Sequence, residues 1–437
     1  MNFVSCVKWI KQGVAKREPD NVHLTEEELR EIVEQKSDEE DESGKPSKPT
    51  SSDDEYDFKN YDNEDELRVS IKGIATFDAD KKKKKKKKKN EKEKKRKRDD
   101  SDDSEKEDEL IKEDDNLLIV GHVDDDYNTL DVYVYNENDG DMYIHHDMVL
   151  KSPALCVEWL NIPGASETSN VCAIGSMKPI VEIWDLDIIN SVAPVFRLGR
   201  RKKKNPEKNY GHTDAVLSLA WNTELTHILC SGGVDNRVLM WDLDDGKVAT
   251  EINSFSDKVQ NLAWNPHNAN FLLTGCADGV LRNYDCRVYD EFKEINLDSP
   301  IESMFWDVTN EHRCFIGTED GQIRHLDWRK KKKPIHQFQA HSKEVTGLCV
   351  DPNHPDVLVS ISTDECMKLW DTSNEYNMIT MKDLKLGGLH CIDLNPDFPY
   401  LAAVGGMSEK RGKTVLKVVS LEESTKPENV SNDEFSE

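Results

Sequence analysis

Two sets of serine, histidine and aspartate in this chain have the residue types of a hydrolytic triad. They are His212, Ser231 and Asp235, and His341, Ser360 and Asp364. A catalytic triad needs a serine on a sharp, exposed turn beside a histidine that activates it. Here each serine lies within an apolar run typical of a β-strand, and the set occurs twice. Both observations favour a structural role over catalysis.

A second possible chemical motif is the glycine-rich stretch GGMSEKRGKT at 405–414. It resembles a phosphate-binding loop, G-x-x-x-x-G-K-[ST], which holds phosphates at the start of a helix. The first required glycine is replaced by Met407, and the surrounding pattern predicts two strands with no helix following. We interpret the stretch as a solvated hairpin loop.

Cysteine usage and hydropathy restrict the class of protein further. The ten cysteines are scattered, mostly in apolar runs, without a C-x-x-C pair of zinc-site spacing, so we expect buried free thiols in a reducing compartment. No apolar run reaches the roughly 18 residues of a membrane span, and MNFVSCVKWIKQG at the start is a poor signal peptide. The sequence predicts no cofactor, metal, membrane or small-molecule substrate.

Five segments end in a large apolar or aromatic residue followed by aspartate. They are IVEIWD at 180–185, RVLMWD at 237–242, VLRNYD at 280–285, QIRHLD at 322–327 and MKLWD at 367–371. The last four endings are 43, 42 and 44 residues apart, a period typical of WD-type β-propeller blades. A single four-stranded blade cannot bury its own faces, so the repeat predicts a ring of blades.

The repeat gives the serine, histidine and aspartate sets a structural meaning. In such blades the aspartate of a tight turn bonds to the histidine, the histidine to a strand serine, and the serine to a tryptophan indole. A buried network of this kind is satisfied and rigid. We therefore predict two structural tetrads, His212, Ser231, Asp235 and Trp241, and His341, Ser360, Asp364 and Trp370.

Degenerate copies bring the predicted ring to seven blades. CVEWLN at 156–161 begins one blade, and 390–421 supplies a last blade that lacks a Trp-Asp ending. Three strands within 116–148 lack an inner strand, and VSCVKWI at 4–10 echoes ALCVEWL at 154–160. The simplest interpretation makes 4–10 this inner strand, followed by a long insertion. The alternative joins the N-terminal strand to the last blade.

The predicted fold is an all-β, seven-bladed WD40 propeller with a long disordered charged insertion and a loose acidic tail. Its parts are an N-terminal strand (1–15), an acidic and lysine-rich insertion (16–115), the propeller (116–421) and the tail (422–437). The insertion is too charged and too poor in apolar residues to offset its chain entropy. Within it, LRVSIKGIATF at 67–77 is apolar enough to dock on another surface.

Charge is unevenly distributed along the chain. The net charge is −27, of which residues 1–116 contribute −7 and the remainder −20. An acidic propeller surface is not expected to bind nucleic acid over a large area, because such binding needs concentrated Lys and Arg.

The acidic tracts also place an acidic residue three positions after several serines, a pattern that suits an acid-directed kinase. These serines are Ser37, Ser52, Ser104 and Ser431.

Short basic segments are the exception to this acidity. The run Lys81–Lys89 and the cluster Lys94, Lys95, Arg96, Lys97 and Arg98 predict a nuclear localisation signal, a phosphate clamp, or only a solvating tract. Two loops of the propeller are also basic, at 197–204 and 329–333, and could be ordinary connections or RNA contacts. The residues predicted to contact RNA are Arg200, Arg201, Lys202, Lys203 and Lys204.

Several stretches resemble the periodic tryptophan protein 1 family of eukaryotic nuclear WD-repeat proteins. They are DNLLIVGHV, MYIHHDM, CVEWLN, EIWDLDIINSVAPVFRLG and GHTDAVLSLAWN. The sequence departs from the pattern in its last blade, where VVSL replaces a Trp-Asp ending, and in its long lysine run. The resemblance implies a nucleolar factor in ribosome production, associated with large-subunit pre-ribosomal particles and with ribosomal-RNA gene transcription.

Two functional hypotheses follow. The first is a non-catalytic scaffold in the nucleus and nucleolus, whose partners are ribosome assembly factors, ribosomal proteins and pre-rRNA. The second is a regulator that binds histones or rDNA chromatin, because an acidic propeller suits basic histone tails. No sequence feature supports an enzyme.

Overall fold

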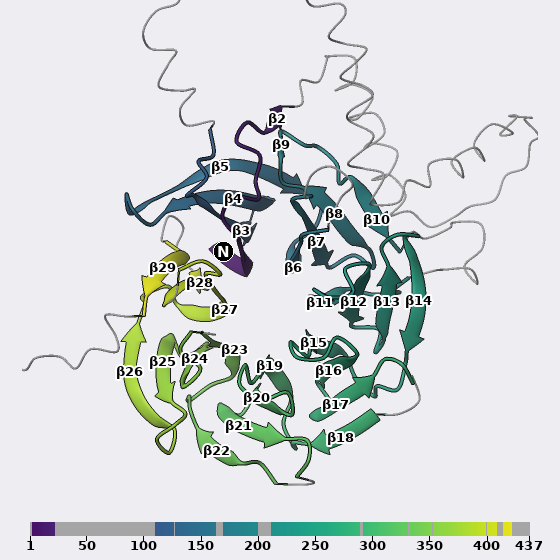
Figure 1. The fold of residues 1–437 in the computed structure, drawn as a ribbon, viewed down its shortest axis with the longest axis vertical. Coiled ribbons are helices and arrows are strands. Elements are labelled where there is room, and N and C mark those ends of the chain that lie inside the picture. Colours follow the sequence, from purple (N-terminus) through teal and green to yellow (C-terminus); the bar gives the residue numbers. More distant parts are fainter. Residues whose placement is uncertain are drawn as a thin grey trace, which may run out of the picture.

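The protein, represented by a computed structural model, is an all-β ring of seven blades (Figure 1). The structure describes residues 2–21, 110–125, 127–162, 169–199, 211–288, 292–330, 333–351, 353–398, 400–408 and 414–421. The predicted propeller fold is confirmed. The predictions for residues 22–109 and for the tail 422–437 lie outside the described residues. Within the described ranges, no helix has the length and apolar character that crossing a membrane requires.

Blades 2 to 6 each have four antiparallel strands, which run in sequence order from the centre of the ring outward. Blade 2 contains β6 (Ala154–Leu160), β7 (Val171–Ser176), β8 (Val181–Asp185) and β10 (Phe196–Leu198). Blade 3 contains β11 (Val216–Trp221), β12 (Ile228–Gly233), β13 (Val238–Asp242) and β14 (Lys247–Ile252). Blade 4 contains β15 (Val259–Trp264), β16 (Phe271–Cys276), β17 (Val280–Asp285) and β18 (Phe292–Asn296).

The remaining regular blades follow the same order. Blade 5 contains β19 (Ile301–Trp306), β20 (Arg313–Thr318), β21 (Gln322–Asp327) and β22 (His336–Gln339). Blade 6 contains β23 (Val345–Val350), β24 (Val357–Ser362), β25 (Cys366–Asp371) and β26 (Asn377–Asp383). Blade 7 contains β27 (Gly388–Leu394), β28 (Leu401–Ser408) and β29 (Leu416–Ser420). The stretch that resembles a phosphate-binding loop thus begins inside β28 and ends just before β29.

Blade 1 is assembled from two distant parts of the chain. It contains β1 (Asn2–Ile10), β3 (Asn116–Val123), β4 (Asn128–Asn136) and β5 (Asp141–Leu150). The strand β1 lies at the centre of the ring (Figure 1) and pairs with β3 from Phe3↔Val123 to Ile10↔Leu117. Its first two residues also pair with β28, at Asn2↔Ser408 and Phe3↔Met407. The structure therefore makes β1 the inner strand of blade 1 and adds a short contact with the last blade.

Side chains of β1 also connect blade 1 to both of its neighbours. The Lys8 ammonium lies 3.2 Å from the Glu158 carboxylate of blade 2, and the charge of Glu158 raises the pKa of Lys8. The backbone N–H of Trp9 donates to Asp393 of blade 7 over 2.8 Å. The N-terminal strand is therefore linked to blades on either side.

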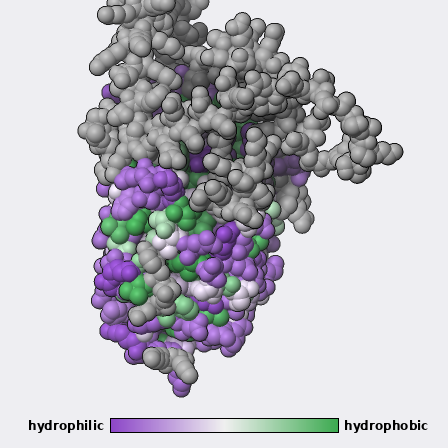
Figure 2. Space-filling view, turned by 90° about the vertical axis from the view of Figure 1, so that its right-hand side faces the viewer, coloured by the Kyte–Doolittle hydropathy of each residue, from purple (hydrophilic) through white to green (hydrophobic). Residues whose placement is uncertain are grey.

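Seven apolar clusters hold the ring together, one at each interface between adjacent blades. Because a blade is covered on both faces, its middle strands are continuous buried runs, as in β7, where all six residues are buried. Outer strands alternate between exposed and covered residues, as in β14. Figure 2 shows the outer wall on the side of β14 and β18, where hydrophobic residues lie among hydrophilic ones.

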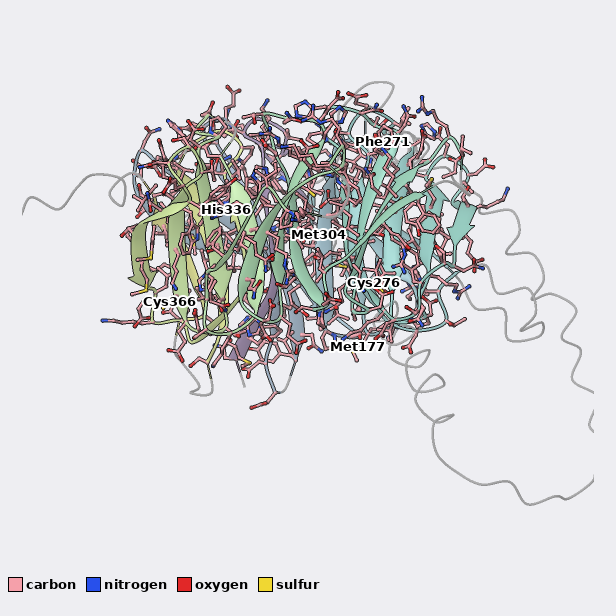
Figure 3. The ribbon with its side chains drawn as sticks, turned by 90° about the horizontal axis from the view of Figure 1, so that it is seen from below. Met177, Phe271, Cys276, Met304, His336 and Cys366 are labelled. Atoms are coloured by element: carbon pink, nitrogen blue, oxygen red, sulfur yellow. The ribbon has the colours of Figure 1, made fainter. Side chains whose placement is uncertain are left out.

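The ring has two faces, which we name by their loops. The turn face carries the connections between blades and the turns between second and third strands, and the insertion face carries the other loops. In Figure 3, Phe271 and Cys276, at the two ends of β16, lie near opposite faces, and Met177 and Cys366 lie on the same side as Cys276, the turn face. Since β1 begins beside the end of β28, its last residue, Ile10, lies toward the insertion face.

Residues next to the insertion are fixed to this second face. The carboxylate of Asp187 accepts a hydrogen bond from the Lys16 backbone N–H over 3.1 Å and from the Asn170 amide over 2.9 Å. The short strand β2 (Asp20–Asn21) pairs in parallel with β9 (Ile188–Ile189), and Ile111 N–H donates to Arg17 O. Residues 16–21 and 110–115, which the sequence pattern assigned to the insertion, therefore pack on the propeller.

The inner strands share an irregularity that the sequence analysis did not detect. Each of the seven has a β-bulge at the same place, after Val4, Ala154, Val216, Val259, Ile301, Val345 and Leu389. In six blades the residue beyond the bulge pairs with a glycine of the second strand, as Cys156 does with Gly175. A Cβ on Gly175 would lie 2.5 Å from Cys156 Sγ and 3.0 Å from the backbone oxygen of Val216. The glycine therefore permits close packing between blades 2 and 3.

We predict that Gly175→Ala destabilises the protein because its added methyl overpacks this contact. The expected loss is about 1–3 kcal/mol in the free energy of unfolding. The matched control is Gly388→Ala, where a Cβ would meet neighbours at ordinary distances of 3.5 Å or more and the change should stay within about 0.5 kcal/mol. Urea unfolding measures both, and equal losses would contradict the packing argument.

Candidate functional site

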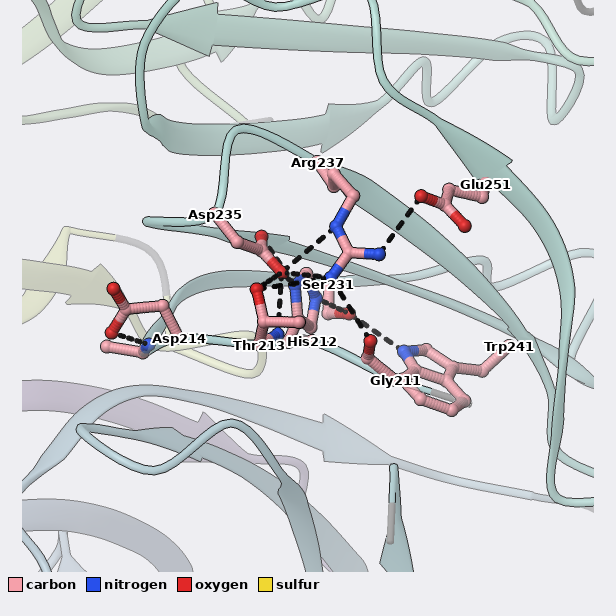
Figure 4. A network of polar contacts seen from close by, with 10 residues as sticks. Gly211, His212, Thr213, Asp214, Ser231, Asp235, Arg237, Trp241 and Glu251 are labelled. Carbon is pink, nitrogen blue, oxygen red and sulfur yellow. Dashed lines mark hydrogen bonds and ion pairs between the residues drawn. The ribbon is translucent and has the colours of Figure 1, made fainter. Parts of the chain in front are cut away.

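The four predicted residues of blade 3 form one chain of hydrogen bonds (Figure 4). His212 Nδ1 lies 2.9 Å from Asp235 Oδ1, and His212 Nε2 lies 2.7 Å from Ser231 Oγ. The Trp241 indole N–H donates to the same Ser231 Oγ over 2.8 Å. The chain begins at the turn between β12 and β13 and ends in the core between blades 2 and 3.

The carboxylate of Asp235 is held by further donors on the turn face. The backbone N–H of Thr213 donates to it over 2.8 Å, as does the Arg237 guanidinium. Burial alone would raise its pKa, but the hydrogen bonds and the charge of His212 outweigh burial and lower the pKa to about 2. The resulting stabilisation is complete above about pH 4 and is lost as the pH falls toward 2.

Blade 6 repeats this arrangement. His341 Nδ1 lies 3.1 Å from Asp364, and both His341 Nε2 and the Trp370 indole lie 2.8 Å from Ser360 Oγ. Burial lowers the pKa of His341, although the charge of Asp364 acts in the opposite direction. A neutral His341 can donate a hydrogen bond from Nδ1–H to Asp364 and accept one at Nε2 from the Ser360 hydroxyl.

The geometry excludes these serines as catalytic nucleophiles. Ser231 and Ser360 are fully buried, with 0% exposure, and each hydroxyl oxygen already meets an indole and an imidazole. A nucleophile must reach its substrate, and these oxygens lie inside strands β12 and β24. What the arrangement does chemically is to satisfy buried polar groups and fix the turn to the core.

Blades 4 and 5 secure the turn aspartate with arginine, which the sequence analysis missed. In blade 4 the Arg282 guanidinium donates to Asp278 over 3.0 Å, and Ser256 Oγ donates to it over 2.6 Å. In blade 5 Arg324 lies 3.5 Å from Asp320. Each arginine follows its aspartate by four residues on the third strand, and that spacing was available in the sequence. A cation at this position replaces the absent histidine.

The turn face is hollowed between blades 5, 6 and 7. The hollow has a volume of about 990 Å³, and six of the twelve residues that line it are charged. Its carboxylates come from Glu319, Glu344, Glu365 and Asp383, and its ammonium groups from Lys343 and Lys385. No sequence pattern indicated this cluster, since its members come from separate loops of different blades. The excess of carboxylates suits a basic polypeptide.

The basic segments are only partly visible in the structure. Arg200, Arg201, Lys202, Lys203 and Lys204, the run Lys81–Lys89 and the cluster at 94–98 lie outside the described residues. In the second basic loop, Arg329 forms hydrogen bonds to both carboxylate oxygens of Asp327, at 2.9 and 2.7 Å. This guanidinium therefore already has a partner within the protein.

The cysteines are free thiols, six of them buried and four partly buried. Burial raises the pKa of the Cys6 thiol to about 11 and that of Cys286 to about 12, so neither is a thiolate at neutral pH. Among the described residues, no group of three or more His, Cys, Asp or Glu side chains is arranged to hold a metal ion.

The seven-fold blade repeat and the buried tetrads define a WD-type β-propeller. Within this class, the family model of the N-terminal domain of nucleolar protein 10-like proteins matches residues 218–397. The periodic tryptophan protein 1 homolog of Drosophila melanogaster is 36% identical over 94% of this chain and 93% of its own length. The chain therefore belongs to the periodic tryptophan protein 1 family.

Two further relatives are more distant. Periodic tryptophan protein 1 of Saccharomyces cerevisiae is 28% identical over 68% of this chain and 62% of its own. The ribosome biogenesis protein WDR12 homolog of Trichoplax adhaerens is 24% identical over 46% of this chain and 49% of its own. The family resemblance seen in the sequence is thereby confirmed.

We predict that Ser231→Ala lowers stability, because it leaves the Trp241 indole and His212 Nε2 buried without their shared partner. The expected cost is about 1–3 kcal/mol. Thr223→Ala, at an exposed position beyond β11, serves as the control and should change stability by less than about 0.5 kcal/mol. Thermal and urea unfolding measure both variants, and a Ser231→Ala protein as stable as the control would argue against the network.

Proposed function

We propose that this protein is a non-catalytic scaffold in ribosome biogenesis. It acts in the nucleus and nucleolus on pre-ribosomal particles of the large subunit and has a link to transcription of the rRNA genes. Family membership supports this role, as does a more distant relative named for ribosome biogenesis. The hydroxyls of Ser231 and Ser360 are held in buried structural networks, which argues against their use as nucleophiles.

The single observation that carries the binding role is the charged hollow of the turn face. Four carboxylates and two ammonium groups surround it. The basic segments of ribosomal proteins would complement this excess of negative charge. The hollow lies on the turn face, opposite the face on which residues 16–21 and 110–115 pack. We propose that assembly factors and ribosomal proteins dock at the hollow.

We predict that reversing the charge of the hollow weakens particle association. The variant Glu319→Lys, Glu344→Lys, Glu365→Lys should reduce co-sedimentation with ribosomal precursors by about tenfold or more, because like charges would repel a basic partner. The control variant Glu224→Lys, Asp245→Lys, Glu311→Lys has the same charge change on loops of the insertion face and should sediment as the unaltered protein does.

If both triple variants lost co-sedimentation equally, association with ribosomal precursors would depend on the net charge of the protein and not on the hollow. The same variants separate this role from the second candidate, a histone-binding regulator, because the acidic rim also suits histone tails. Salt-dependent binding of histone peptides at the hollow, together with unchanged association with precursors, would favour that candidate.

We further propose that the loop with Arg200, Arg201, Lys202, Lys203 and Lys204 contacts pre-rRNA phosphates. Replacing all five with alanine should reduce pre-rRNA crosslinking in cells. It should also make binding of purified protein to single-stranded RNA less salt-dependent, by about 0.7 in logarithmic slope for each phosphate that the protein no longer neutralises. Alanine replacement at 329–333 is the comparison and should have a smaller effect, because Arg329 is paired with Asp327.

The lysine-rich tract is proposed as the nuclear and nucleolar localisation signal. It comprises Lys81–Lys89 with Lys94, Lys95, Arg96, Lys97 and Arg98, a density of positive charge that suits import and anionic partners. Deleting 81–98 should move a fluorescent fusion to the cytoplasm, whereas deleting the equally long segment 38–55 should not. Unchanged nucleolar fluorescence after the first deletion would reject the assignment.

A further inference from the structure

The outer edge of blade 7 is open among the described residues. There β29 pairs with β28 alone, whereas each of the other six blades has a fourth strand. An unpaired edge presents N–H and C=O groups that can pair with a further strand. The open position lies beside β29, between β26 of blade 6 and β5 of blade 1 (Figure 1).

One wall of this position is apolar. In blade 1, Tyr133 pairs with Ile144 and Tyr135 with Met142, and both tyrosines pack against the cluster shared by blades 7 and 1. Directly paired residues share a face of a sheet, so Ile144 and Met142 also face blade 7. Val149 lies beyond a bulge in β5 and pairs with Thr129, which is on the same face of β4 as Tyr133, so Val149 also faces blade 7. These three side chains are 52%, 36% and 65% exposed, respectively.

The other wall is polar. Thr380 and Lys382 of β26 pair with Leu369 and Met367, which belong to the cluster between blades 6 and 7. Both side chains therefore face blade 7, and Lys382 Nζ lies 3.5 Å from the backbone oxygen of Ser420. A strand lying beside β29 would need an apolar face toward blade 1 and a polar face toward blade 6.

We propose that residues 67–72 of the insertion form the fourth strand of blade 7. Their sequence, LRVSIK, alternates strictly, with Leu67, Val69 and Ile71 on one face and Arg68, Ser70 and Lys72 on the other. The apolar face meets Met142, Ile144 and Val149. Glu64 and Glu66 extend the polar face and have the charge opposite to that of Lys382 and Lys417.

The connections to this segment are long enough and start in the right place. The chain leaves the propeller after Asn21 and returns at residue 110, close to Arg17, on blades 1 and 2. Residues 22–66 precede the segment and 73–109 follow it, and a flexible chain of 45 residues spans about 35–40 Å on average. Blade 7 is only one blade away from blade 1. A strand entering from the insertion face runs antiparallel to β29, as a blade requires.

The tail that follows β29 is a poorer occupant. Its sequence, EESTKPENVSNDEFSE, has no alternation of apolar and polar residues, and Pro427 lacks the N–H needed for pairing. Its apolar residues, Val430 and Phe435, do not suffice to cover the wall formed by β5.

Hydrogen exchange of the full chain tests the proposal at β29. In the unaltered protein, the alternate N–H groups of Leu416–Ser420 that point away from β28 should be protected, because pairing with β28 protects only the others. The variant Leu67→Ser, Val69→Ser, Ile71→Ser should accelerate this exchange by about tenfold or more, with exchange in β12 unchanged as a check on folding. The matched control, Arg68→Ser, Lys72→Ser, retains the apolar face and should leave β29 protected.

Several results would overturn the proposal. Unprotected β29 in the full chain would show that nothing covers the edge. Protection that survives the triple variant but disappears on removal of 422–437 would assign the position to the tail. Protection that depends on protein concentration would assign it to a second copy of the chain.

Discussion

The antiparallel pairing of β1 with β3 is the interaction on which the ring depends. These strands are separated in sequence by more than one hundred residues, yet β1 is the inner strand of blade 1 and touches blade 7 through β28. Its Lys8 pairs with Glu158 of blade 2, and its Trp9 N–H donates to Asp393 of blade 7. Without β1, three neighbouring blades would be weakened at once.

The turn face shows how different residues solve one local problem. In blades 3 to 6, an aspartate lies in the turn between the second and third strands. Its carboxylate needs hydrogen-bond donors on the turn face. Histidine supplies one in blades 3 and 6, and arginine in blades 4 and 5. Only the histidine version continues to a serine and a tryptophan in the core. These networks stabilise the loops of the turn face.

The sequence predicted most of the fold and part of the site. The repeat period, the strand endings and the similarity between VSCVKWI and ALCVEWL were sufficient to predict seven blades, because these features arise from local strand patterns. The anchoring of residues 16–21 was not predictable, since Asp187 and Lys16 meet only in the folded chain. The same holds for the hollow, whose carboxylates come from separate blades. The bulge opposite glycine was missed, although Gly232, Gly275 and Gly317 follow the period of the repeat.

The central claim, that β1 closes the ring as a strand of blade 1, is tested most directly by cutting the chain. A site-specific protease sequence inserted at residue 90 allows cleavage of the folded protein, followed by gel filtration without denaturant. The account predicts that the fragment containing β1 stays with the propeller and separates only in denaturant. Release of that fragment under native conditions, with the remaining chain still folded and monomeric, would contradict it.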